Sequence, residues 1–179
     1  MSDRPPVAEL IADLAERLGV PRFVAVCTDL LGGAERETYV DELRALTGHE
    51  WEPGDGVFDR AVWRDYWVRT WGARGLLHVW DDAAVDAIVA GLADSHWRPA
   101  EMCLKVATRH EVAGTGDGAV ALAGHDLPRV RAQAMRALAV TGDTEHVDAV
   151  RAHLDDEDAA VRRQAARALA ALEGRLDLA

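Results

Sequence analysis

The sequence predicts an all-α protein, an α-α superhelix of repeated helical hairpins with a helical N-terminal cap. Two segments, VRAQAMRAL at 130–138 and VRRQAARAL at 161–169, are nearly identical and begin 31 positions apart. Within both segments, small and apolar residues recur at the spacing of one helix face. The composition agrees, because 49% of the 179 residues are hydrophobic, few are aromatic, and alanine-rich runs favour helix.

The period of 31 residues extends to four copies, whose first residues, counted as position zero, are 68, 99, 130 and 161. Positions zero, four, seven and eight form the expected inward stripe of an amphipathic helix. Position four is always small, which lets neighbouring helices approach closely: Gly72, Cys103, Ala134 and Ala165. Repetition of one helical unit in this way is typical of solenoid proteins.

Position six is basic in every copy: Arg74, Lys105, Arg136 and Arg167. Its angle from the inward stripe predicts that these side chains face solvent. A solvated surface explains regular outward cations. A stripe that binds phosphate or acidic groups is the alternative.

The remaining helices are predicted from shorter patterns. Second helices of the hairpins are expected at residues 82–93, 118–124 and 144–154. Helices at 6–18, 21–31 and 35–46 are expected to form the cap. We therefore predict a single domain, 1–179, with a cap and loop at 1–56 and hairpin repeats at 57–179. Trp51, in the loop at 48–56, is expected to plug the cap, or else to mark a recognition loop.

A motif of the form L-x-D-x(4,5)-V-R-x-x-A-x-x-A-L occurs at Leu154–Leu169 and, more loosely, at Leu122–Leu138. It resembles the bacterial HEAT-like repeats that are also found in phycobilin lyase subunits, and the resemblance covers residues 61–173. The resemblance implies a stacked right-handed helical array that serves mostly as a scaffold for binding, with no single activity.

The resemblance also implies a ladder, in which the arginine at position one pairs with an aspartate of the preceding turn. Arg131 is then expected to pair with Asp126, and Arg162 with Asp156 or Asp158. The copy that begins at Pro99 has Ala100 at this position, so one rung of the ladder is expected to be missing.

Tryptophans supply the main candidates for a binding surface. Trp63, Trp67 and Trp71 recur at i, i+4 and i+8, which predicts one shared helix face. Burial of this face under the cap is favoured over an open aromatic groove for a ligand, peptide or base. Trp97 and Glu101 are four residues apart and are also expected to share a face. DNA alkylation-repair glycosylases, which are HEAT-like, use tryptophan faces with a nearby carboxylate, so this pair keeps that alternative open.

The charge balance bears on partners. The formal net charge of −11 argues against tight binding to a nucleic-acid backbone, which needs clustered lysine and arginine. Residues 143–158 hold seven carboxylates and one arginine, which predicts a solvated surface or, alternatively, a face for a basic partner.

No catalytic signature is found. The histidines form no metal-ligand set, and GTGDG at 114–118 lacks the lysine and hydroxyl residue of a phosphate loop. Cys27 and Cys103 lie in apolar helical patterns and are expected to be free and buried in a reducing cytoplasm. We expect no cofactor, no membrane span and no secretory signal.

These observations predict a non-enzymatic scaffold or adaptor in the cytoplasm, a monomer or weak homo-oligomer that binds a protein partner. The first alternative is a DNA-binding or glycosylase-like protein, which needs a tryptophan and a carboxylate exposed together in a basic groove. The second is a small-molecule or tetrapyrrole-binding protein of the lyase-subunit kind, which needs an enclosed apolar pocket beside Trp63 and Trp67.

Overall fold

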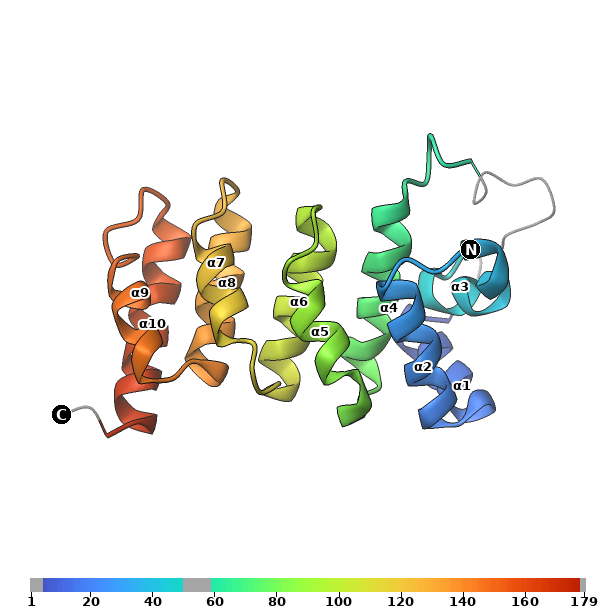
Figure 1. The fold of residues 1–179 in the computed structure, drawn as a ribbon, viewed down its shortest axis with the longest axis horizontal. Helices are drawn as coiled ribbons and strands as arrows, with labels where there is room; N and C mark the ends of the chain where they lie inside the picture. The colour runs from blue at the N-terminus through green and yellow to red at the C-terminus, as the bar shows by residue number, and fades with distance from the viewer. Residues whose placement is uncertain (1–4, 50–58, 178–179) are drawn as a thin grey trace. The chain divides into compact units, whose positions relative to one another are not determined.

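The computed structural model describes residues 5–49 and 59–177, and every regular element within these ranges is helical (Figure 1). The all-α fold class predicted from the sequence is therefore confirmed. The chain forms two compact units, Met1–Ala87 and Ile88–Ala179, which are considered separately. The predicted single-domain organisation stays a prediction. Trp51 and most of its loop lie outside the described residues.

The first unit packs three N-terminal helices against the first predicted repeat helix. Its elements are α1 (Val7–Leu18), α2 (Val20–Leu31), η1 (Arg36–Tyr39), α3 (Val40–Thr47), α4 (Asp65–His78) and η3 (Asp82–Ala84). Helix α2 lies along α4, and α1 contacts both α2 and α3. The contact between α2 and α4 is close: a methyl group on Gly72 would lie 2.5 Å from the carbonyl oxygen of Cys27. The N-terminal helices thus cover α4, as a cap requires.

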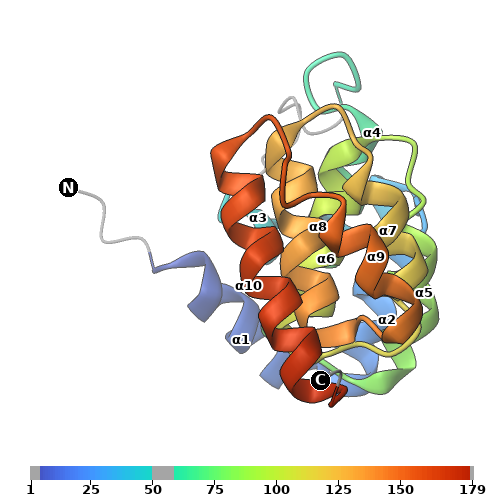
Figure 2. The same cartoon turned by 90° about the vertical axis from the view of Figure 1, so that its left-hand side faces the viewer.

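The second unit is built from helical hairpins. The boundary between the units falls within α5 (Val85–Gly91), and the elements that follow are α6 (Trp97–His110), α7 (Gly116–Ala123), α8 (Pro128–Thr141), η4 (Thr144–His146), α9 (Val147–Arg151) and α10 (Ala159–Arg175). Figure 2 shows α6, α8 and α10 side by side in one row, with α7 and α9 in a second row. The long helices of the first row are the predicted repeat copies.

Burial confirms the register read from the sequence. All four residues at position four are buried, and so are Val68, Pro99, Val130 and Val161 at position zero. Leu169, at position eight of the last copy, is half-buried, whereas its three counterparts are buried. The small residues are therefore the contact points between packed helices.

The repeat also includes the turn that precedes each long helix of the second unit. Side chains at three positions 31 residues apart, Asp94, His125 and Asp156, each accept a hydrogen bond from the backbone N–H two residues further along, at 2.8–2.9 Å. Such a turn fixes the direction in which the chain enters the helix. A histidine replaces aspartate in the middle copy, which hides this part of the repeat from a reading of residue types.

Candidate functional site

Side chains from the three long helices of the second unit line an open groove of about 400 Å³. The lining residues are Glu101 and Lys105 on α6, Arg129, Ala132, Gln133 and Arg136 on α8, and Ala160 on α10. Three of these side chains are cationic and one is a carboxylate. The groove thus brings together three of the predicted site residues, Glu101, Lys105 and Arg136.

Glu101 is only 7% exposed, and both of its oxygens are engaged by cations. The Nε of Arg129 donates to Oε1 at 3.0 Å and its Nη2 donates to Oε2 at 2.9 Å. The Nζ of Lys105, one helical turn away, lies 3.5 Å from Oε2. Both oxygens of this buried carboxylate are thus occupied by charge-assisted contacts. Glu101 therefore positions Arg129 and Lys105, rather than being open to a substrate.

Arg129 also contacts Trp97, which places the two halves of the predicted Trp97–Glu101 pair on the same arginine. The guanidinium carbon of Arg129 lies 4.9 Å from the centre of the indole ring, and that of Arg98 lies 4.4 Å from it. Both distances are typical of cation–π contacts. Neither arginine was predicted as a site residue from the sequence. They stand 31 residues apart, immediately before position zero, so the period itself carried the signal.

Gln133 orients the remaining cation of the groove. Its side chain is buried, donates to the Thr108 hydroxyl at 3.1 Å and accepts from Nη1 of Arg136 at 3.0 Å. Arg136 and Arg129 are exposed, Arg129 with 57% of its side chain, and 35% of the Lys105 side chain is exposed. All three cations are therefore held in place and still accessible from solvent.

The other two members of the position-six set lie elsewhere. Arg167 is exposed on α10 and does not line the groove. Arg74 belongs to the first unit and is half-buried. The prediction that the whole set faces solvent is correct for Arg136 and Arg167. It is correct only in part for Arg74 and Lys105, which are half-buried, and the Lys105 side chain lies next to Glu101.

The three tryptophans of the first unit do not share the one helix face that was predicted for them. Helix α4 begins at Asp65, so Trp63 precedes the helix and does not share a helix face with Trp67 and Trp71. The backbone carbonyl of Trp63 instead accepts a hydrogen bond from the buried Arg36, which also pairs with Asp65 at 2.5 Å.

The three indole rings nevertheless meet, because the turn folds Trp63 back over α4. The ring centres of Trp63 and Trp71 are 5.5 Å apart, and those of Trp67 and Trp71 are 6.1 Å apart in a stacked arrangement. Trp71 is 5% exposed, and the other two rings are half-buried. The rings form a packed aromatic cluster.

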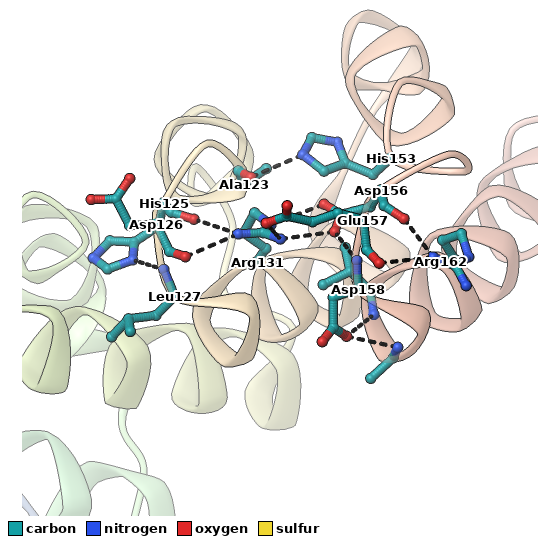
Figure 3. A network of polar contacts seen from close by, with 12 residues as sticks. Ala123, His125, Asp126, Leu127, Arg131, His153, Asp156, Glu157, Asp158 and Arg162 are labelled. Atoms are coloured by element: carbon teal, nitrogen blue, oxygen red, sulfur yellow. Dashed lines mark hydrogen bonds and ion pairs between the residues drawn. The ribbon is translucent and has the colours of Figure 1, made fainter.

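Arg131 forms the rung that joins two hairpins of the second unit (Figure 3). Its Nε and Nη2 donate to the two oxygens of Asp156 at 2.9 and 2.8 Å. Its Nη1 donates to the backbone carbonyls of His125 and Asp126, both at 3.1 Å. The predicted pairing with the Asp126 carboxylate is wrong, because Asp126 supplies its backbone oxygen and the carboxylate comes from the next repeat.

The charges of this rung stabilise each other. The hydrogen bonds from Arg131 hold the pKa of Asp156 below its usual value, and those to Asp156 raise the pKa of Arg131. Both side chains are less than one tenth exposed. An ion pair of this kind, with fork geometry and further hydrogen bonds, satisfies the conditions under which buried charge is tolerated.

Arg162, one period later, also differs from its prediction. Its Nη1 donates to the backbone carbonyls of Asp156 and Glu157 at 2.7 and 3.1 Å, and the predicted carboxylate pairing with Asp156 or Asp158 is not formed. Asp158 instead accepts hydrogen bonds from the backbone N–H groups of Ala160 and Val161 and caps α10. The physical reason is that Asp156 already holds Arg131 and Asp158 holds the helix start.

The rung that was predicted to be missing lacks both its arginine and its carboxylate. Position one of the copy that begins at Pro99 is Ala100, and the matching position in the following turn is His125, where the next copy has Asp156. The ion pair between Arg129 and Glu101 joins α6 and α8 in its place.

Several predictions concern groups outside the groove. Cys27 and Cys103 are free and buried, as predicted, and burial raises the pKa of both thiols. Within residues 5–49 and 59–177, no cluster of three or more histidine, cysteine or acidic side chains is placed to hold a metal ion. In the same part of the chain, no helix combines the length and apolar character that crossing a bilayer demands.

Comparison with known proteins gives one family match, which lies within the second unit. The family model of HEAT repeats matches residues 117–179, which confirms the predicted HEAT-like resemblance for this segment. The matched segment contains α8, α10 and the Arg131–Asp156 rung. The predicted resemblance of residues 61–116 stays a prediction. No curated protein and no solved structure matches the chain.

Proposed function

We propose that the protein is a non-enzymatic scaffold that binds an acidic segment of a protein partner along the groove between α6, α8 and α10. The observation that carries this proposal is the set of three oriented, accessible cations around one groove, Lys105, Arg129 and Arg136. HEAT repeats generally serve protein interaction, which supports the same class of function.

Charge complementarity favours an acidic partner. The protein carries a formal net charge of −11, so a local cationic groove stands out from its surroundings. Opposite charges across an interface raise the association rate and fix the orientation of the partner. A cytoplasmic location and a monomeric or weakly associating chain belong to this proposal.

The two alternatives find less support in the contacts. A glycosylase-like site needs a carboxylate open to a substrate, whereas Glu101 is held by Arg129 and Lys105. The tetrapyrrole alternative needs an enclosed apolar pocket beside Trp63 and Trp67, whereas the rings of these residues pack against each other and against Trp71.

A capture experiment tests the proposal. The tagged protein, its Arg136→Glu variant and its Arg167→Glu variant are incubated with native lysate at low salt, and bound protein and nucleic acid are both quantified. Arg167 is the matched control, because it stands at the same repeat position, is exposed and lies outside the groove.

We expect one protein to be recovered in near-stoichiometric amount with the wild type and with Arg167→Glu, and to be lost with Arg136→Glu. Equal loss with both variants would assign binding to general positive charge and contradict the groove. Nucleic acid that is retained without protein, and released as salt rises, would favour the DNA-binding alternative.

A further inference from the structure

Arg131 and Arg162 occupy equivalent places in two successive repeats and are held in the same way. Arg131 donates from Nη1 to the carbonyl oxygens six and five residues before it, those of His125 and Asp126. Arg162 donates from Nη1 to the oxygens six and five residues before it, at Asp156 and Glu157. Figure 3 shows both side chains folded back on the turn ahead of their helix. The two guanidinium groups are therefore oriented by the same backbone geometry.

The two arginines differ in whether a carboxylate binds their Nε and Nη2 atoms. The Nε and Nη2 of Arg131 form a fork on Asp156, and the residue is only 8% exposed. Arg162 is exposed, and within the part of the chain that the structure describes its hydrogen bonds go to the two carbonyl oxygens alone. Its Nε and Nη2 are the atoms that, in Arg131, bind a carboxylate.

The surface next to Arg162 is equivalent in repeat position to a surface that is covered in the previous repeat. Helix α10 packs against α8, and Ala132 and Met135 of α8 are buried. Their equivalents one period later on α10 are Arg163 and Ala166, and both are exposed. This face of α10 is thus the exposed equivalent of the buried face of α8, with Arg163 in place of Ala132 and with Arg162 at its edge.

We propose that Arg162 and this face of α10 bind a partner protein through an aspartate in the turn that starts one of its helices. The aspartate takes the place that Asp156 has on Arg131, and the partner's helix lies on Ala166. A fork between arginine and carboxylate provides both the attraction and the orientation. This site goes beyond the proposed function, because none of these residues lines the groove of Lys105, Arg129 and Arg136.

A second copy of the chain is a poorer occupant than a different protein. Of the three equivalent turns in the second unit, one has its aspartate, Asp156, on Arg131, and another has His125 instead of a carboxylate. Asp94 is the carboxylate of the remaining turn, and it has a further interaction besides the hydrogen bond that it accepts from the backbone N–H of His96.

A titration of the intact protein tests the carboxylate site. Sodium acetate is the probe, sodium chloride at matched ionic strength is the blank, and the Nε–Hε signals of the arginines are followed by NMR after ¹⁵N labelling. Arg163 is the matched control, because it is exposed on the same helix and no hydrogen bond to a carbonyl is recorded for it among the described residues. We expect a saturating shift at Arg162 that exceeds the shift at Arg163. Equal shifts at the two signals would overturn the proposal.

An extended chain tests the aspartate turn itself. Residues 142–179 are placed a second time after Leu172, which keeps the period of 31, with Arg163→Ala in the first copy to match Ala132. Arg162→Ala in the first copy should then lower the Tm of the extended chain clearly and that of the native chain hardly at all. An equal effect in both chains would overturn the proposal, and the acetate titration decides the matter if the extended chain does not fold.

Sedimentation velocity distinguishes the two occupants. We expect the native chain to stay at one sedimentation coefficient as its concentration rises. Association with rising concentration that Arg162→Ala abolishes would assign the site to a second copy and overturn the proposed partner.

Discussion

At the scale of single residues, a charged side chain finds its partners in the neighbouring repeat as well as in its own repeat. Arg131 has two acceptors in its own turn and three in the turn of the following hairpin, the two oxygens of Asp156 and one of Glu157. The sequence around Arg131 indicates only the acceptors in its own turn. Asp126 was therefore predicted as the carboxylate, and the true partner, Asp156, depends on how closely the hairpins stack.

Removal of one partner from this rung should be costly. We expect Arg131→Ala to lower the free energy of unfolding by about 3–5 kcal/mol, since it leaves Asp156 buried without its counter-charge. Urea denaturation measures the change. Arg162→Ala is the matched control, and its loss should stay below about 1 kcal/mol because the residue is exposed. Equal losses in the two variants would show that the rung contributes nothing beyond the shared carbonyl contacts.

The same ion pair makes stability depend on pH. The folded protein holds the pKa of Asp156 below its ordinary value, chiefly through hydrogen bonds from Arg131. Its contribution is therefore complete above the unfolded pKa, about 3.9, and is lost as the pH falls through the lower folded value. We expect the stability difference between wild type and Asp156→Asn to be constant near neutral pH and to shrink below about pH 4. A difference that does not change with pH in urea titrations would contradict this.

At the scale of helices, the period of 31 residues predicted the long helices and their buried faces. It did not predict where each helix begins. The small residues at position four are required wherever two helices touch, so the long helices and their buried faces could be predicted. The i, i+4, i+8 spacing of the tryptophans continues past the start of α4, so it placed Trp63 on a helix that begins at Asp65. Arg129 could have been predicted from the same period, because Arg98 stands 31 residues before it.

Helix contact at position four gives a direct prediction. We expect Gly72→Ala to lower the free energy of unfolding by about 1–3 kcal/mol, because the added methyl group overpacks the contact with the backbone of α2. That methyl would lie 2.5 Å from the oxygen of Cys27 and 2.7 Å from the nitrogen of Leu31.

The control is Gly174→Ala on α10, where an added methyl group meets nothing within 4 Å. Alanine is the better helix former there, so this variant should gain about 0.5–1 kcal/mol. Thermal melts of both variants that match the wild type would contradict the assigned contacts.

At the scale of the whole molecule, each compact unit has its own source of cohesion. In the first unit, α2 and α3 cover α4: a methyl group on Gly75 would lie 2.4 Å from Sγ of Cys27 and 2.9 Å from Leu46. In the second unit, the rung and the alanine contacts of position four hold the hairpins together. The predicted functional surface is divided in the same way, with the tryptophan cluster in one unit and the cationic groove in the other.

Deletion of residues 1–56 should therefore remove the cover of α4 and expose its apolar face. We expect the truncated chain to aggregate, and size-exclusion chromatography of the expressed protein measures this. A truncated chain that stays monomeric with a cooperative melt would contradict the cap. In that case Trp63, Trp67 and Trp71 would belong to a binding surface.

Site-specific photo-crosslinking tests the central claim, a protein partner in the groove, most directly. A photoreactive phenylalanine derivative replaces Ala160, which lines the groove, or Ala121, which is exposed on α7 in the other row of helices. The account predicts that irradiation in native lysate yields one protein adduct from position 160 and none from position 121. Adducts with nucleic acid at position 160, equal adducts from both positions, or none from position 160 would contradict it.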